Sequence, residues 1–205
     1  MSQKALRITV WTTVLVVVAA AGTYAWYIHR RHEAKLAYME TATAAMHAGQ
    51  LPKAAEAYQQ ALKIDPKLLA ARTGLAEVYC SQGQVEKALH EHRRGCELAP
   101  RNPDAHSDLA RTCLLHHRYP EAVEALERAV ALAPSDAHLH LLLASAYRWN
   151  GEPEKAQAQL TEVEKLDPGS RAAQNARRAL RRQAEREQAG DAGKTTRDEA
   201  ATAHR

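Results

Sequence analysis

The sequence predicts an all-α chain: an N-terminal transmembrane helix, a solenoid of helix–turn–helix repeats and a C-terminal capping helix. Three observations predict this architecture. Residues 8–28 carry no charged side chain, prolines recur every 34 residues from Pro66 to Pro168, and no strand-like alternation of β-branched residues occurs after residue 30. Phenylalanine is absent and 5% of residues are aromatic, whereas the abundant alanine, leucine, glutamate and arginine favour helices.

Residues 8–28 are predicted to cross a lipid bilayer. At 1.5 Å per residue a helix of this length spans about 30 Å, the thickness of the hydrocarbon core. Aromatic side chains stand near both ends, where rings settle among lipid headgroups: Trp11, Tyr24, Trp26 and Tyr27. The alternative is a cleaved signal peptide, with Thr23-Tyr24-Ala25 as its cleavage site. The length of the stretch and the Arg30-Arg31 pair after it favour the transmembrane interpretation.

The orientation of this helix is weakly specified, because the short tail 1–7 and the basic link 29–34 both carry positive charge. The positive N-terminus favours placing the repeats outside. Arg30-Arg31 favours a cytoplasmic array, and so do the cysteines, since Cys80, Cys96 and Cys113 are an odd, scattered set without a C-x-x-C pattern. We expect a single-pass protein of a bacterial inner membrane with a cytoplasmic array, the periplasmic alternative remaining open.

A proline every 34 residues in a helical chain indicates a helix–turn–helix solenoid, each proline ending the second helix of its repeat. The prolines divide the chain into four repeats, 35–68, 69–102, 103–136 and 137–168. Position 8 is alanine in every repeat, and so is position 20, which lets the two helices approach closely: Ala42, Ala76, Ala110, Ala144, Ala54, Ala88, Ala122 and Ala156. Position 24 holds larger core residues: Tyr58, His92, Leu126 and Leu160.

The turns between the helices carry their own signals. Position 15 is predicted to adopt a left-handed backbone, which glycine tolerates and histidine accepts at modest cost: Gly49, Gly83, His117 and Gly151. Asn102 and Ser135-Asp136 supply capping side chains for the first helices of the third and fourth repeats, and Pro103 suits a first helical position.

The register resembles the tetratricopeptide repeat family over residues 35–168. The resemblance implies a right-handed solenoid that binds a protein or peptide partner on a concave groove formed by the first helix of each repeat. Groove positions, with the neighbouring tryptophan, are then Met39, Thr43, Met46, Thr73, Glu77, Asp104, Ser107, Arg111, His138, Ser145, Arg148 and Trp149. The first end is apolar and the far end polar, which suits a peptide with one apolar and one charged end. For each residue alone, a merely solvated position is the competing interpretation.

One binding mode of that family is excluded. The carboxylate clamp for chaperone tails needs lysine, asparagine and arginine at defined positions. Here those positions hold Met39, Thr43, Gly74, Asp104 and Asp108. With two of the five carrying the opposite charge, a co-chaperone of this type is not expected.

Residues 169–189 are predicted to cap the last repeat, because each repeat buries its apolar face only against neighbours. Ala172, Ala176, Leu180 and Ala184 form an apolar stripe. No aromatic residue stands among the arginines at 177–182, so these arginines indicate a solvated face of the cap. Nucleic acid is therefore not an expected partner. Residues 190–205 lose all periodicity and are predicted to be a disordered tail.

No phosphate-binding loop, nucleophile motif or metal-ligand pattern occurs in the chain. Cys113, His116 and His117 form the best metal-ligand cluster, but Cys113 falls at a core position of the repeat and is expected to be a packed thiol. No enzyme, cofactor, metal or small-molecule substrate is therefore expected. Two non-enzymatic functions stay open, a groove-binding adaptor and an accessory subunit that binds by its convex face or membrane helix.

The exit from the predicted membrane helix, Ala25-Trp26-Tyr27-Ile28-His29-Arg30-Arg31, together with the repeat segment from Gly83 to His92, resembles the family of lipopolysaccharide assembly protein B. Members carry a cytoplasmic array on an inner-membrane helix and a four-cysteine metal module. No such cysteine set occurs here, so the resemblance bears only on the orientation.

Overall fold

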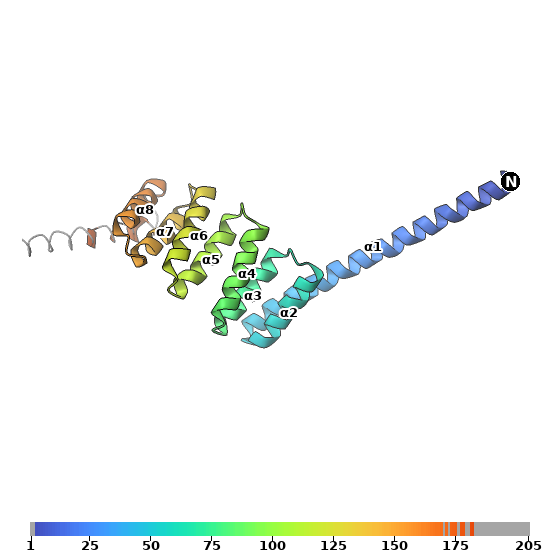
Figure 1. Cartoon of the computed structure of the whole chain (residues 1–205), viewed down its shortest axis with the longest axis horizontal. Helices are drawn as coiled ribbons and strands as arrows, with labels where there is room; N and C mark the ends of the chain where they lie inside the picture. The colour runs from blue at the N-terminus through green and yellow to red at the C-terminus, as the bar shows by residue number, and fades with distance from the viewer. Residues whose placement is uncertain (1–2, 170, 172, 176, 179–180, 183–205) are drawn as a thin grey trace, which may run out of the picture. The chain divides into compact units, whose positions relative to one another are not determined.

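The structure is a computed structural model that describes residues 3–169, 171, 173–175, 177–178 and 181–182, without the side chains of residues 3–10 and 12. Its regular structure in this part is helical (Figure 1). The helices are α1 (Gln3–His47), α2 (Leu51–Ile64), α3 (Leu69–Ser81), α4 (Val85–Leu98), α5 (Pro103–Leu115), α6 (Tyr119–Leu132), α7 (Ala137–Trp149) and α8 (Pro153–Leu166). The chain divides into an N-terminal unit, Met1–Glu91, and a C-terminal unit, His92–Arg205.

The expected membrane segment, basic link and first repeat helix are one unbroken helix, α1, of 45 residues (Figure 1). The link 29–34 therefore does not interrupt the backbone. Its residues continue the helix because neither glycine nor proline occurs between Gly22 and Gly49, and His29 lies 3.2 Å from Glu33 one turn later. No helix in the part of the chain with described side chains is both long enough and apolar enough to cross a membrane. Residues 8–10 and 12 of the expected span lie outside that part.

The turns inside the repeats have the predicted left-handed residue. The backbone angle φ is 69° at Gly49, 72° at Gly83, 60° at His117 and 82° at Gly151. In each turn the next amide N–H reaches back to a carbonyl five residues earlier, which satisfies the end of the first helix. The repeated bond is Gln50 to Ala45, Gln84 to Tyr79, Arg118 to Cys113 and Glu152 to Tyr147, at 2.8–2.9 Å.

The predicted core columns are buried. The alanines at positions 8 and 20 have exposed fractions between 0% and 4%. Position 24 is also buried, with Leu126 at 0%, Tyr58 and His92 at 5% and Leu160 at 9%. Where a tyrosine occupies this column, its partner is a glycine: a Cβ atom on Gly74 would lie 2.3 Å from Cζ of Tyr58. Small residues therefore set the spacing of the helices, as the alanine columns indicate.

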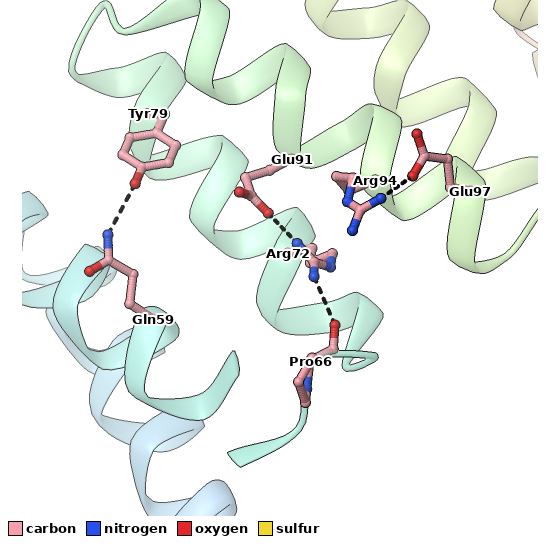
Figure 2. Close-up of polar contacts among 7 residues, drawn as sticks. All are labelled: Gln59, Pro66, Arg72, Tyr79, Glu91, Arg94 and Glu97. Atoms are coloured by element: carbon pink, nitrogen blue, oxygen red, sulfur yellow. Dashed lines mark hydrogen bonds and ion pairs between the residues drawn. The ribbon is translucent and has the colours of Figure 1, made fainter. Parts of the chain in front are cut away.

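The second helices of the repeats end as the prolines predict, since α2, α4, α6 and α8 each stop two residues before a proline. The structure adds a contact that the register did not predict. The side chain at position 4 of the next repeat donates to the proline carbonyl: Arg72 to Pro66 at 2.8 Å (Figure 2), His106 to Pro100 at 3.0 Å and His140 to Pro134 at 3.0 Å. Each bond satisfies a carbonyl left without a helical partner.

The predicted caps of α5 and α7 are confirmed, because Asn102 accepts from the N–H of Asp104 at 2.9 Å and Asp136 accepts from the N–H of His138 at 2.8 Å. The expected capping helix is described only in part. Ala173 is fully buried and Arg177 pairs with Glu164 at 2.6 Å. The stripe of Ala172, Ala176, Leu180 and Ala184 and the tail 190–205 lie outside the residues with described side chains.

Candidate interaction surfaces

The expected groove residues fall into two sets. Those on α1 and α3 belong to the N-terminal unit, in which these two first helices are in contact, and those on α5 and α7 belong to the C-terminal unit. None of them is buried. The first set is Met39, Thr43, Met46, Thr73 and Glu77, and the second is Asp104, Ser107, Arg111, His138, Ser145, Arg148 and Trp149.

In the N-terminal unit the apolar part of the set is only half accessible. Met39 and Met46 pack against the cluster of buried residues that joins α1, α2 and α3. The Thr43 hydroxyl donates to carbonyls of its own helix, 3.1 Å from Met39 O and 3.0 Å from Glu40 O. Glu77 is exposed, and its charge adds to burial in raising the pKa of Tyr58. Glu77 is therefore the side chain of this set best placed to meet a charged partner.

In the C-terminal unit the set carries opposite charges. Arg111 is exposed and lies 3.3 Å from the Asp108 carboxylate one turn earlier. The Ser107 hydroxyl donates to Asp104 O and the Ser145 hydroxyl to Leu141 O, each at 3.0 Å. These hydroxyls keep only their acceptor capacity for a partner. Arg111 stays available because an exposed ion pair at this spacing is weak.

Three side chains, Tyr119, Arg148 and Trp149, lie together at the ends of α6 and α7. The ring of Trp149, 59% exposed, stacks on Tyr119 with centroids 6.0 Å apart and an angle of 15°. Arg148 lies over the same indole at 5.5 Å, and Nδ1 of His117 is 2.7 Å from the Tyr119 hydroxyl. We call Tyr119, Arg148 and Trp149 the aromatic platform. Its tyrosine was not predicted, because Tyr119 and Trp149 are 30 residues apart and the 34-residue register does not align them.

A cavity of about 620 Å³ opens among α4, α5 and α6 of the C-terminal unit, mostly on the second helices of two repeats. Its charged walls are paired, with Arg93 2.5 Å from Glu121 and Arg128 2.8 Å from Glu124. The lining also includes Cys96, Leu109, Ala125 and Leu132. This cavity was not predicted, because no residue motif marks it and its walls come from three helices.

Two of the three cysteines, Cys113 and Cys96, are core or cavity residues. Cys113 is fully buried, which confirms its prediction as a packed thiol, and burial raises its pKa to about 11. Burial likewise raises the pKa of Cys96 to about 11, and its thiol lies 3.3 Å from the Ala105 carbonyl. A thiol in this state is a poor nucleophile and a poor metal ligand at neutral pH. Within the described residues no group of three or more His, Cys, Asp or Glu side chains forms a metal site.

Comparison with known proteins agrees with this architecture. One tetratricopeptide repeat model matches residues 45–91 and 114–180, more than half of the chain, and a second matches residues 73–137. No curated protein sequence matches the chain.

Solved structures share the fold at low sequence identity. The crystal structure of MamA protein is 24% identical with a TM-score of 0.61, covering 76% of this chain and 88% of that chain. PilF of Pseudomonas aeruginosa is 22% identical with a TM-score of 0.61, covering 74% and 71%. YrrB, described as a TPR protein with an unusual peptide-binding site, is 21% identical with a TM-score of 0.54, covering 70% and 76%. The chain belongs to the tetratricopeptide repeat family.

Proposed function

We propose that this tetratricopeptide repeat scaffold is a single-pass membrane adaptor that binds protein or peptide segments along the first helices of its repeats. The observation that carries groove binding is the aromatic platform, in which a large exposed indole contacts both the Tyr119 ring and the guanidinium of the groove residue Arg148. Tryptophan, tyrosine and arginine are the residues most enriched among binding hot spots. YrrB, of the same fold, is described with a peptide-binding site. The proposal includes no catalysis, cofactor, nucleic acid or small-molecule substrate.

The charges of the two sets define the partner's chemistry. Arg111 and Arg148 favour a carboxylate-bearing segment, and Trp149 adds a surface for an aromatic or aliphatic side chain. In the N-terminal unit Met39 and Met46 offer half-exposed, adaptable apolar contacts next to the acidic Glu77. A segment with an apolar and a basic side chain suits the set of the N-terminal unit, and a segment with a carboxylate suits the set of the C-terminal unit.

Charge reversal tests this proposal. The variants Glu77→Arg, Arg111→Glu and Arg148→Glu are each expected to reduce partner capture from a membrane extract by about tenfold, because a like charge at an interface opposes association. Arg94→Glu is the matched control, since Arg94 is exposed on a second helix and pairs with Glu97. Capture is quantified by mass spectrometry against the unmodified chain. If all three reversals retain every partner, groove binding is wrong.

The cavity among α4, α5 and α6 favours a second candidate, an accessory or assembly subunit of a membrane-bound complex that binds through its second helices. Arg93→Glu with Arg128→Glu breaks both ion pairs of the cavity wall. If this double variant loses the partner and the groove variants keep it, the groove-binding adaptor is wrong and the accessory subunit is the better proposal.

The exposed apolar surface of α1 supports the anchor. Trp11 is 72% exposed, Leu15 71% and Val16 66%, which is unfavourable in water and favourable in lipid. At the far end of the uncharged stretch Arg30 lies over the Trp26 ring at 5.2 Å and Arg31 over Tyr27 at 5.7 Å. Interfacial aromatic rings next to cations are typical of a headgroup layer. The proposed location is a bacterial inner membrane with the repeats on the cytoplasmic side.

Carbonate extraction of membranes tests the anchor. The full chain is expected to stay in the pellet at its intact mass of 22.6 kDa, and a chain lacking residues 1–28 is expected to be released, because it loses the apolar stretch. A mass shortened at Ala25 identifies a cleaved signal peptide instead. A reporter fused after Arg205 that is active only outside the cytoplasm reverses the proposed orientation.

A further inference from the structure

Helix α2 returns along α1 toward the proposed membrane end of that helix. The two helices are tied there by a pair of polar contacts within the N-terminal unit. Nη2 of Arg31 donates to the Ile64 carbonyl at 2.6 Å, and Nζ of Lys35 lies 3.1 Å from Oδ2 of Asp65. The last turn of α2 and the loop after it therefore lie beside residues 31–35 of α1.

The position of this loop along α1 sets its height above the bilayer. At 1.5 Å per residue, Arg31 and Lys35 follow Ile28, the last residue of the uncharged stretch, by about 5 and 10 Å. The headgroup layer is about 5–8 Å thick on each side of the hydrocarbon core. The loop between α2 and α3, residues 65–68, thus falls at the outer edge of that layer. The opposite turn, at Gly49 and Gln50, stands roughly 25 Å farther along the helix than this loop.

The charge of this end of the N-terminal unit is positive. Lys63 and Lys67 are exposed, and Arg30 and Glu33 are exposed on the neighbouring turn of α1, where Glu33 lies 3.2 Å from His29. The one carboxylate in the loop, Asp65, is neutralised by Lys35. The hydrogen bond from Lys35, with the Lys67 N–H and the charges of Lys35 and Arg31, lowers the pKa of Asp65, so this pair persists at neutral pH.

We propose that the α2–α3 loop, with Lys63 and Lys67, is a second membrane contact that binds anionic phospholipid headgroups. The inference rests on the proposed anchor. Each basic side chain near an anionic surface favours contact by roughly fivefold. With α1 unbroken and tied to α2 at Arg31 and Lys35, this contact holds the first repeat at a fixed height and tilt on the bilayer. The groove residues of α1 and α3 are then presented at a set distance from the lipid surface.

Headgroup quenching in the full chain tests the inference. The chain is reconstituted into phosphatidylglycerol-containing vesicles that carry a headgroup nitroxide, with a fluorescent amino acid at position 70, 50 or 32. Ala70 is exposed in the first turn of α3, so a probe there reports the loop and leaves Lys63 and Lys67 in place. Position 50 reports the opposite turn of the same hairpin, and position 32 reports the insertion of α1. We expect quenching at 70 to approach that at 32 and to exceed that at 50 by roughly fivefold. If position 32 is quenched and position 70 is quenched no more than position 50, this inference alone is overturned. Absence of quenching at 32 overturns the anchor and this inference together.

Lipid charge and a matched lysine pair test headgroup binding itself. Lys63→Glu is expected to lower quenching at position 70 by roughly fivefold or more in phosphatidylglycerol vesicles, because a repelled charge replaces an attracted one. Lys53→Glu is the control, since Lys53 is also exposed on α2 but lies at its other end. If quenching at 70 is equal in phosphatidylcholine and phosphatidylglycerol vesicles and Lys63→Glu does not change it, the binding of anionic headgroups is overturned.

Discussion

Between pH 7 and pH 5 the full chain is expected to lose about 2 kcal/mol of stability that the His92→Leu variant does not lose. His92 is 5% exposed in the core, and burial, aided by the charge of Arg111, lowers its pKa from 6.5 to about 4. Between these two pKa values the unfolded chain binds a proton that the folded chain does not. The free energy of unfolding therefore falls as the pH falls from about 7 to about 4, by about 1.4 kcal/mol per unit of pKa difference.

Leucine is the appropriate replacement because Leu126 and Leu160 occupy the same position in later repeats. Urea unfolding followed by circular dichroism at pH 7 and pH 5 measures the effect. His90→Leu, on the exposed face of the same helix, is the control that accounts for removing a histidine. An equal pH dependence in the unmodified chain and in His92→Leu would show that His92 does not stay neutral in the core.

Gly74→Ala is expected to destabilise the chain by roughly 2 kcal/mol, the usual magnitude for forcing an extra methyl group into a packed core. The added Cβ would lie 2.3 Å from Cζ of Tyr58 and 2.6 Å from its hydroxyl oxygen. The ring cannot easily retreat, because Tyr58 is 5% exposed among α1, α2 and α3.

In a Tyr58→Leu background, Gly74→Ala is expected to stabilise the chain instead of destabilising it. Leucine is shorter than tyrosine, so the clash is removed and the higher helix propensity of alanine stabilises α3 by up to about 1 kcal/mol. The four chains of this double-mutant cycle are compared by urea unfolding. An equal effect of Gly74→Ala with tyrosine or leucine at position 58 would mean that the ring does not determine the need for glycine.

The sequence by itself determined the register, the ends of the second helices of the repeats, the left-handed turns and the buried alanine columns. All of these follow from local rules. A proline ends a helix wherever it falls, and a tight turn needs a left-handed residue. His117 illustrates how far such rules reach, because its φ of 60° follows from position 15 alone although it is not a glycine.

The tertiary structure decided the contacts that do not share the 34-residue period. Tyr119 meets Trp149 although they hold different repeat positions, and Arg31 bonds a carbonyl 33 residues away at the end of α2. Such contacts depend on how far one helix slides along another and on which rotamer a long side chain adopts. A pattern of residue types in one chain does not specify either. The aromatic platform, the cavity on the second helices and the tie between α1 and α2 therefore became visible only in three dimensions, whereas the family and its core could be read from spacing.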